Sequence, residues 1–500
     1  MITDKGIVPV KGGQNKVLST DKIELIHKSS VDILENIGIK NSHPEARALM
    51  ESCGCIVDND TQIVKIPEDV LMKYIKMAPA KIGLYGIDKR YDIMLDDSDD
   101  VYVMSGAGSI NVLDMDGCMR PSTMKDLEDL TRLKLNLENM DIEHFLVIPL
   151  DTEFGPSSQC EMLTFAHNIT NNRRNFYTLL GGCREGLKFQ LEMASVIAGS
   201  VENVIKKPFF VAGLCIISPL THPHGFVEEL LECGKNNIPV YIETDGNAGG
   251  TTPYTIAGAI TENNANIMAA VALAQMANPG APCIYASSTG ILDMQALNFA
   301  GNAPESTLIQ MGSAQMAHYY HLPYYGSCTT DSKLPDAQMG YESMQHFLGC
   351  AMAGVNIIHV AIGNLAMMGI ANYEQCLMDN EILGAAFRLI DGIEISEESI
   401  GLDAFREIGH RSDFLSSTHT LKYCRSRERW LPKLTDRNTW GQWMNQTGGK
   451  DMRERAKDMV REILSEPAPE FVSDKDRKEI WEIARNAQYE IEKIRKIKKY

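Results

Sequence analysis

The pattern of apolar and polar residues along this chain changes near residue 123. From there to about residue 400, stretches with helical spacing of apolar residues alternate with short segments that are apolar on both faces. Strands of this kind are typical of a parallel sheet that helices cover on both sides. We therefore predict an α/β fold built from repeated strand–helix units.

Seven segments have the length and composition of buried strands: 145–149, 176–180, 209–217, 239–244, 282–287, 324–328 and 357–361. Helical spacing is found at 123–137, 161–170, 185–198, 225–236, 255–276, 305–320, 336–353 and 374–389. Seven strands, with an eighth not identified, favour a (β/α)8 TIM barrel. A doubly wound sheet is the alternative, but the Gly-rich turn of its dinucleotide-binding versions is not found.

The two ends of the chain differ from this central region, and three domains are predicted. Residues 1–122 are expected to form helices and β-hairpins that pack on the barrel, with a helix at 19–37 and a hairpin at 55–66. Residues 123–400 are the catalytic barrel core. Residues 401–500 are expected to form an irregular segment and a C-terminal helical tail with helices at 451–464 and 474–499. Short strands are also expected within the first domain, at 82–85, 101–104 and 109–113.

Charge narrows the classes of partner. The 500 residues include 48 Lys and Arg against 66 Asp and Glu, a net charge of −18. A nucleic-acid-binding protein would show a basic face, and an anionic membrane surface would attract a basic one. The closest approach to a membrane helix, at 347–371, is interrupted by Asn356, His359 and Asn364. We therefore expect neither a nucleic-acid nor a membrane partner.

The cysteines and the first residues favour a cytoplasmic location. The 12 cysteines are scattered and form no CxxC pair, so neither a zinc ribbon nor a disulfide framework is indicated. Free thiols in this number are compatible with a reducing compartment. Residues 1–16 contain no apolar segment of the kind that directs export.

In a TIM barrel the functional residues lie in the loops that follow the strands. The segment ETDGNAGGTTP, residues 243–253, follows one predicted strand, and its glycines would let the backbone approach a ligand closely. Glu243 and Asp245 could face a cation there. A flexible loop with capping Thr and Asp residues explains the segment equally well.

Three further segments follow strands: 287–304, the polar stretch 326–338, and His359 with Gly363 and Asn364. A lone histidine such as His359 is more often a satisfied core or surface residue than a ligand. His222 and His224 in THPHG could bind a metal, but no obvious set of further ligands accompanies them, and a helix start around Pro223 is favoured. We therefore predict no metal site. P-loop, GxSxG, HExxH and GxGxxG motifs are not found.

Several of these strand-end segments resemble the trimethylamine methyltransferase family. The block TDSKLPDAQMGYE, residues 330–342, is long enough to be specific. The similarity also covers 243–275, PGAP at 279–282, RPST at 120–123, 379–384 and 419–421, so that it extends over nearly the whole chain. The chain is accordingly identified as a member of that family.

The resemblance implies a TIM barrel that moves a methyl group from a methylated amine to the cobalt of a corrinoid (cobalamin) carried by a separate cognate protein. No cofactor would be bound by this chain itself, and we expect a homo-oligomer. The archaeal trimethylamine enzymes contain pyrrolysine, whereas every residue here is standard. This difference points to the non-pyrrolysine branch, whose members act on quaternary amines such as glycine betaine. A trimethylamine or methylamine methyltransferase without pyrrolysine and a non-catalytic betaine-binding barrel remain alternatives.

A quaternary ammonium leaves as a neutral amine, so the protein must position and desolvate it rather than supply an acid or a base. Aromatic faces and carboxylates hold such a cation, at roughly 0.5–2 kcal/mol for each cation–π contact. A betaine carboxylate would need Arg, His or backbone N–H groups. The predicted catalytic residues are Asp331, Lys333 and Gln338. The predicted substrate-binding residues are Glu243, Asp245, Tyr285, Tyr324, Tyr341, His346, Phe347 and His359, with Tyr325, Trp440 and Trp443 as further aromatic candidates.

Overall fold

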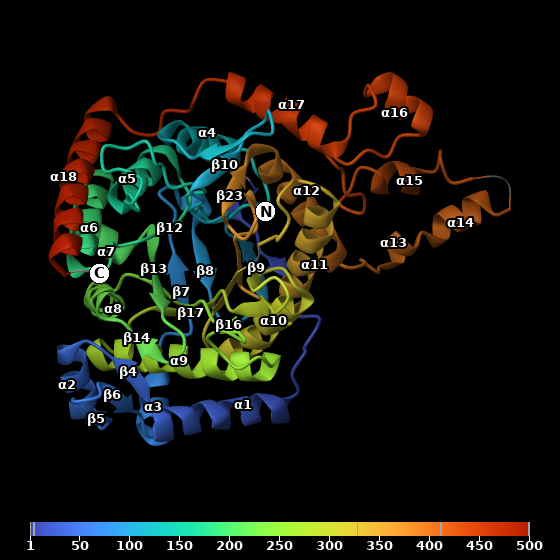
Figure 1. Cartoon of the computed structure of the whole chain (residues 1–500). Coiled ribbons are helices and arrows are strands. Elements are labelled where there is room, and N and C mark those ends of the chain that lie inside the picture. Colours follow the sequence, from blue (N-terminus) through green and yellow to red (C-terminus); the bar gives the residue numbers. More distant parts are fainter. Residues whose placement is uncertain (1, 4–5, 328, 411–412, 499–500) are drawn as a thin grey trace.

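The centre of the protein is a parallel sheet that curls on itself (Figure 1). The computed structural model describes residues 2–3, 6–327, 329–410 and 413–498. Seven parallel strands follow one another in the order β12-β13-β15-β17-β20-β21-β9, and β3 (Val10–Lys11) pairs antiparallel with β9. The seven are β12 (Phe176–Thr178), β13 (Phe210–Ile216), β15 (Val240–Thr244), β17 (Cys283–Ser287), β20 (Tyr324–Ser327), β21 (Ile357–His359) and β9 (Asp100–Val103).

Two isolated parallel bridges close the sheet into a barrel. Met104, just after β9, pairs with Ile142, and the next residue, Glu143, pairs with Phe176 of β12. The two-residue segment Ile142–Glu143 therefore occupies the position of the eighth barrel strand, between β9 and β12. The predicted (β/α)8 barrel is confirmed.

The structure changes two details of the strand prediction. The strand expected at 145–149 does not form as a strand: the barrel pairing lies earlier in the chain, at Ile142–Glu143, and within 145–149 Val147 makes an isolated parallel bridge with Ser109. Phe145 is buried all the same, so the apolar character of this stretch reflects burial in a loop at the end of the barrel. The strand that the seven-strand pattern lacked is β9, which corresponds to the short strand expected at 101–104 in the first predicted domain.

Helices surround the barrel. The longest of those that follow its strands, α9 (Ile256–Ala277), is buried over nearly its whole length, because it packs between the barrel and the helices α1 and α3 of the N-terminal region (Figure 1). The others are α4 (Met124–Lys134), α5 (Glu161–Asn171), α6 (Arg184–Ala198), α7 (Val201–Lys206), α8 (His224–Lys235), α10 (Pro304–Tyr319), α11 (Ala337–Ala353) and α12 (Tyr373–Ile390).

The N-terminal region has its own small sheet in the order β14-β4-β6-β5. The hairpin predicted at 55–66 is confirmed as β5 (Ile56–Asp58) and β6 (Ile63–Lys65), and the helix predicted at 19–37 ends before Gly38. β14 (Thr221–His222) comes from the barrel region and pairs in parallel with β4 (Ile39–Asn41). The helices here are α1 (Thr20–Asp32) with the π-helical turn Ile33–Ile37, α2 (Pro44–Ser52), α3 (Glu68–Ile75) and the 3-10 turn Lys89–Tyr91.

In the part of the chain that the structure describes, shorter strands make up four further small sheets. Three of these sheets belong to the N-terminal region or join it to loops of the barrel, and the fourth lies in the loops after β15 and β17. Their strands are β1 (Ile2–Thr3), β2 (Gly6–Ile7), β7 (Ile82–Leu84), β8 (Ile93–Leu95), β10 (Asn111–Leu113), β11 (Met119–Pro121), β16 (Asn247–Ala248), β18 (Gly290–Asp293), β19 (Asn298–Ala300), β22 (Asn364–Leu365) and β23 (Ile370–Asn372).

The C-terminal region returns to the barrel after a detour. Residues 391–410 and 413–446 project from the body as an arm, and four short helices lie in these described residues (Figure 1). Helix α17 (Met452–Ser465) then packs on α12 and α4, and α18 (Asp474–Lys498) packs on α5 and α6. Within the described residues, no helix combines the length and apolar character needed to cross a bilayer. The arm helices are α13 (Glu397–Ile400), α14 (Leu402–Ile408), α15 (Thr418–Tyr423) and α16 (Trp440–Gln446).

Candidate functional site

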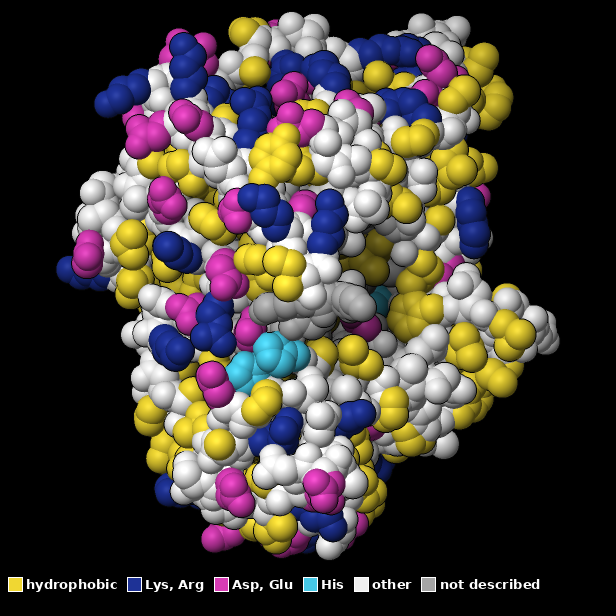
Figure 2. All heavy atoms as spheres, turned by 60° about the vertical axis from the view of Figure 1, so that its left-hand side comes forward, with side chains coloured by type: hydrophobic (Ala, Val, Ile, Leu, Met, Phe, Trp, Pro, Cys, Tyr) yellow, Lys and Arg dark blue, Asp and Glu magenta, His cyan; other side chains and the backbone are white. Residues whose placement is uncertain are grey.

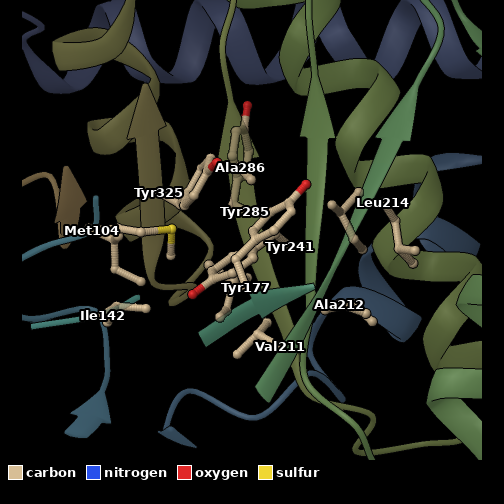
Figure 3. Close-up of a cluster of buried hydrophobic side chains, with 14 of the residues drawn as sticks. Met104, Ile142, Tyr177, Val211, Ala212, Leu214, Tyr241, Tyr285, Ala286 and Tyr325 are labelled. Atoms are coloured by element: carbon tan, nitrogen blue, oxygen red, sulfur yellow. The ribbon is translucent and has the colours of Figure 1, made fainter. Parts of the chain in front are cut away.

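Aromatic rings from four barrel strands and one loop meet inside the barrel. The strand residues are Tyr177 of β12, Tyr241 of β15, Tyr325 of β20 and His359 of β21. The loop residue is His144, which directly follows the segment Ile142–Glu143. We call these five residues the aromatic cluster. Ring centroids lie 4.1 Å apart for His144–Tyr177, 4.7 Å for Tyr241–Tyr325 and 4.6 Å for Tyr325–His359. Figure 3 shows the three tyrosines converging from their strands.

A glycine makes room for one of these rings. A Cβ added at Gly213 of β13 would lie 1.8 Å from Oη of Tyr177. The Tyr177 ring therefore crosses the backbone of the neighbouring strand, where only glycine leaves enough space. Tyr177 in turn lies parallel to Tyr241 and to His359, with ring centroids 5.8 and 6.0 Å apart.

The two histidines of the cluster are joined by a hydrogen bond and carry no charge at neutral pH. Nδ1 of His144 lies 3.0 Å from Nε2 of His359, and Nδ1 of His359 is hydrogen-bonded to the Tyr325 hydroxyl. Burial lowers the pKa of His359 to about 3 and the pKa of His144 well below its usual value. Burial disfavours the protonated imidazole, so the cluster does not repel a cation.

Two carboxylates lie beside the cluster. Successive side chains of a strand point to opposite faces, so Tyr241, Glu243 and Asp245 extend to the same side from β15 and its continuation. Burial and the neighbouring charge of Asp245 raise the pKa of Glu243 to about 8, although hydrogen bonds with Ser288 and Tyr325 oppose the shift. Burial also raises the pKa of Asp245. The pair would be stabilised by a positive charge placed between its carboxylates and the rings.

A hollow at the carboxyl end of the barrel lies next to these groups, with Cys215 and Gly213 of β13 in its lining. Cys215 and Asp245 have exposed surface, although desolvation by the surrounding protein raises the pKa of both. A side chain that lines an internal space combines exposed surface with desolvation in this way. A cavity of about 270 Å³ lies against Cys215 and Gly213, and Figure 2 shows a hollow with hydrophobic, histidine and acidic side chains in its depth.

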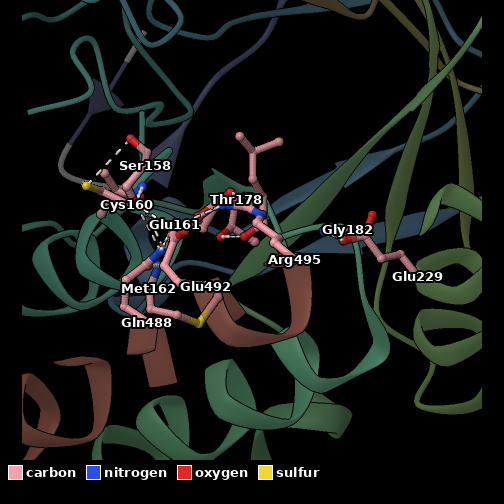
Figure 4. A network of polar contacts seen from close by, with 12 residues as sticks. Ser158, Cys160, Glu161, Met162, Thr178, Gly182, Glu229, Gln488, Glu492 and Arg495 are labelled. Carbon is pink, nitrogen blue, oxygen red and sulfur yellow. Dashed lines mark hydrogen bonds and ion pairs between the residues drawn. The ribbon is translucent and has the colours of Figure 1, made fainter. Parts of the chain in front are cut away.

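The C-terminal helix α18 supplies another wall of this cavity. Arg495 of α18 forms an ion pair with Glu161 of α5, which is 2% exposed, and both line the cavity together with Glu229 (Figure 4). Gln488 of α18 accepts a hydrogen bond from the Met162 amide at 3.0 Å. Burial raises the pKa of Glu229 to about 8. This wall is therefore acidic as well, with one arginine paired to one of its carboxylates.

The structure places Tyr285 and Tyr324 away from the aromatic cluster. The hydroxyl of Tyr285 lies 3.4 Å from Oδ1 of Asn264 on α9, and that of Tyr324 donates to Oε1 of Gln310 on α10 at 2.6 Å. Both rings therefore lie between the barrel and its helices. Tyr325 has the opposite orientation because it is the next residue along β20.

Helix α11 carries three other predicted residues, which also lie outside the cluster. Tyr341 is 62% exposed, and Phe347 is buried in the core. Nδ1 of His346 lies 3.1 Å from Oγ1 of Thr307 on α10, so this histidine joins two helices. In the arm, the Trp440 and Trp443 rings contact each other.

The predicted catalytic residues lie in the loop after β20 and at the start of α11. Lys333 is exposed and donates to the Asp331 carbonyl at 2.7 Å, and Gln338 donates to Glu342 at 2.7 Å. Both contacts hold the loop and the helix start in place. The Asp331 carboxylate is half-buried and accepts from the Asn302 amide at 3.3 Å, and burial raises its pKa.

Unpaired polar groups lie next to Asp331. Both side-chain polar atoms of Asn302 and the hydroxyl of Thr329 are buried without a hydrogen-bond partner. A Cβ added at Gly301 would lie 3.0 Å from the Thr329 methyl group, so the loops after β17 and β20 touch here. Buried polar groups without partners are uncommon and call for a ligand or water.

Sequence reasoning brought forward Glu243, Asp245, Tyr325 and His359, and the structure gathers these four. It missed Tyr177, Tyr241 and His144. Tyr241 could have been found, because it precedes Glu243 by two residues on a predicted strand and so shares its face. His144 was missed because the strand expected at 145–149 started too late.

Comparisons with known proteins agree with the resemblance. The trimethylamine methyltransferase (MTTB) family matches residues 6–489. A trimethylamine methyltransferase of Desulfitobacterium hafniense is 31% identical over 478 residues, covering 94% of this chain and 93% of the relative. A glycine betaine methyltransferase from another strain of that species is 28% identical over 455 residues, covering 91% and 93%.

One solved structure is similar over most of its length. The monomethylamine methyltransferase of Methanosarcina barkeri has a TM-score of 0.48 and 11% identity, and the match covers 91% of this chain and 95% of that one. At that level the similarity adds nothing to the fold already visible in the closed sheet.

Proposed function

We propose, from the fact that the chain belongs to the trimethylamine methyltransferase family, that it transfers a methyl group from a quaternary amine to the corrinoid of a partner protein. The observation that carries this proposal is the combination of the aromatic cluster with the Glu243–Asp245 pair. Rings and carboxylates around neutral histidines form an environment for an organic cation that has no N–H to donate.

The residues of this chain would bind and orient the substrate. Tyr177, Tyr241 and Tyr325 would contact the ammonium methyl groups, and Glu243 with Asp245 would balance the charge. The cobalt of the partner's corrinoid would supply the nucleophile. When the C–N bond breaks, its electron pair stays on nitrogen, so the leaving amine is neutral and needs no proton. The lowered pKa values of His144 and His359 fit a site that supplies none.

Glycine betaine is the first substrate to test. A betaine carries a carboxylate, which would require hydrogen-bond donors at the mouth of the barrel. The side-chain NH2 group of Asn302 and the Thr329 hydroxyl are buried donors without partners. One relative is a glycine betaine methyltransferase, which supports the same choice.

Trimethylamine is the second candidate. The observation that favours it is the relative with 31% identity, which is named a trimethylamine methyltransferase. Protonated trimethylamine has an N–H that could donate a hydrogen bond to Glu243 or Asp245. It has no carboxylate that could accept hydrogen bonds from Asn302 and Thr329. Asn302→Ala therefore separates the two substrates, since it should weaken betaine binding alone.

The partners expected from the sequence fit this assignment. A reduced cobalt acceptor persists only in a reducing compartment, which supports the cytoplasmic location.

The arm exposes large apolar side chains, among them Ile393 at 83% and Trp440 at 76%, and buries few residues of its own. Apolar surface of this kind favours an interface, and a second copy of the chain is its occupant in the proposed homo-oligomer.

An anaerobic transfer assay tests the function. Purified protein is mixed with chemically reduced cobalamin and either glycine betaine, proline betaine, carnitine or trimethylamine, and the visible spectrum is followed. We expect methylcobalamin with one quaternary amine. Calorimetric binding of a betaine, without transfer either to free cobalamin or to the cognate corrinoid protein, would favour the non-catalytic alternative. A folded protein that binds none of these amines would contradict the proposal.

A further inference from the structure

We propose that His43, His224 and Glu228 bind one divalent metal ion of the zinc type, which fastens the N-terminal region to the barrel. One ligand atom from each residue lies within 4.8 Å of the others. The three residues are contributed by two parts of the chain that are far apart in sequence. The site is separate from the aromatic cluster, and the inference does not depend on the proposed function.

Backbone pairing brings the ligands together. In the parallel pair of β4 and β14, Asn41 lies opposite His222. The Ser42 amide continues this pairing by donating to the His222 carbonyl at 3.3 Å. His43 and His224 are each two residues further along, so their side chains meet beyond the strand ends. Figure 1 shows β4, β14, α2 and α8 close together at the lower left.

The side chains are oriented for a shared ion. Nδ1 of His43 accepts a hydrogen bond from the Ala46 amide at 3.3 Å as the N-cap of α2, so Nε2 carries the ring proton. When Nε2 binds an ion, that proton moves to Nδ1 and the hydrogen bond to Ala46 is given up, because a neutral imidazole has one lone pair. His224 is the first residue of α8, and Glu228 follows one turn later, with Nδ1 of His224 3.8 Å from a Glu228 oxygen. The centroids of the two imidazole rings are 4.5 Å apart. Two histidines and one glutamate are a common zinc donor set, with water in the fourth position.

The charges favour the ligand forms. Glu228 is 6% exposed and supplies the negative charge that a divalent ion requires. Arg184 competes for this carboxylate, with Nη2 3.4 Å from the same oxygen. The Arg184 side chain is 43% exposed and can turn toward solvent when an ion binds.

Metal titration of the full-length protein tests the site. After dialysis against a chelator, zinc is titrated by calorimetry into the wild type and into His43→Asn, His224→Asn and Glu228→Gln. Asparagine at position 43 keeps the acceptor that caps α2, so this variant removes a ligand and preserves the helix start. We expect one zinc per chain in the wild type and at least a tenfold weaker affinity in each variant. His321→Asn, at an exposed histidine elsewhere, is the matched control and should bind like the wild type.

Two further readouts separate this site from the cysteines. Cobalt(II) at nitrogen and oxygen ligands gives visible d–d bands without the intense near-ultraviolet band of a thiolate, and Cys118→Ser with Cys424→Ser should leave the titration unchanged. Zinc should raise Tm in the wild type and not in His224→Asn, because an ion that binds only the folded state stabilises it. Arg184→Ala should tighten binding. Absence of saturable zinc binding to the folded wild type, or unchanged binding in His224→Asn and Glu228→Gln, overturns the proposal.

Discussion

The barrel interior and the loop at residues 329–336 lie at the same end of the molecule and use their polar side chains differently. Inside the barrel, Glu243 and Asp245 have raised pKa values, and the charge they would carry is matched by no nearby basic side chain in the described contacts. In the loop, Thr330 donates to Glu342 at 2.5 Å, and Asp336 accepts the Gln338 and Met339 amides at the start of α11. Apart from the Thr329 hydroxyl, these loop side chains satisfy one another, whereas the two carboxylates inside the barrel have no cationic partner in the described contacts.

The residues that identify the family are therefore largely different from the residues suited to binding a cation. The block at 330–342 identifies the family most clearly, and most of its polar groups maintain the shape of a helix start. The groups best suited to a cation are spread over several strands, one or two from each. Four predictions test the contrast, from the largest expected effect to the smallest.

Glu243→Gln should have the largest effect. It removes a charge next to the substrate cation while keeping the size of the side chain and the hydrogen bond to Ser288. We expect substrate affinity to fall about 100-fold, in the range of 2–5 kcal/mol for losing one partner of a buried charge pair. Calorimetry with the substrate identified above gives the affinity. Tyr285→Phe is the control outside the barrel, and an equal loss there would remove the distinction between inward and outward residues.

Gly213→Ala should displace the Tyr177 ring without unfolding the barrel. The added Cβ would lie 1.8 Å from the Tyr177 hydroxyl, so the ring must move out of the aromatic cluster. We expect about a tenfold weaker affinity, equivalent to one cation–π contact of roughly 1–2 kcal/mol. Gly340→Ala, where an added Cβ meets nothing within 4 Å, is the matched control. Wild-type affinity in a correctly folded Gly213→Ala protein would show that Tyr177 does not contact the substrate.

Substrate binding should tighten as the pH rises toward 8. Glu243 has a pKa of about 8 in the free site, and a bound cation favours its ionised form. Below pH 8 the ionised fraction of Glu243 falls by up to tenfold per pH unit, and the affinity for the substrate falls in the same proportion. Above pH 8 the affinity levels off. Glu243→Gln should flatten this profile. An affinity that weakens with rising pH in the wild type would contradict the assignment.

Lys333→Ala should have the smallest effect. The ammonium group is exposed and contacts a carbonyl of its own loop, so we expect a change in stability within about 0.5 kcal/mol and unchanged transfer. Asp331→Ala is expected to reduce turnover more than stability. Equal effects of the two substitutions on kcat would place the whole loop, rather than Asp331, at the reaction.

Particular residues show how far the sequence could be read. The barrel was predictable because strands such as 239–244 and 282–287 are apolar on both faces and separated by helical spacing. Which tyrosine of the Tyr324-Tyr325 pair points inward was not, because a shift of one residue exchanges the two faces of a strand. Arg495 and Glu161 could not be paired either, since nothing local in the chain indicates which helix α18 packs against.

The position of Arg495 also bears on how the protein is made. The ribosome produces all strands of the barrel well before α18, so a newly folded barrel would carry Glu161 without its arginine partner and the cavity without one of its walls. An unpaired buried carboxylate is costly, which disfavours a closed site at that stage. Cation binding at full strength is therefore expected only after synthesis has passed α18, so that chains interrupted earlier do not retain substrate.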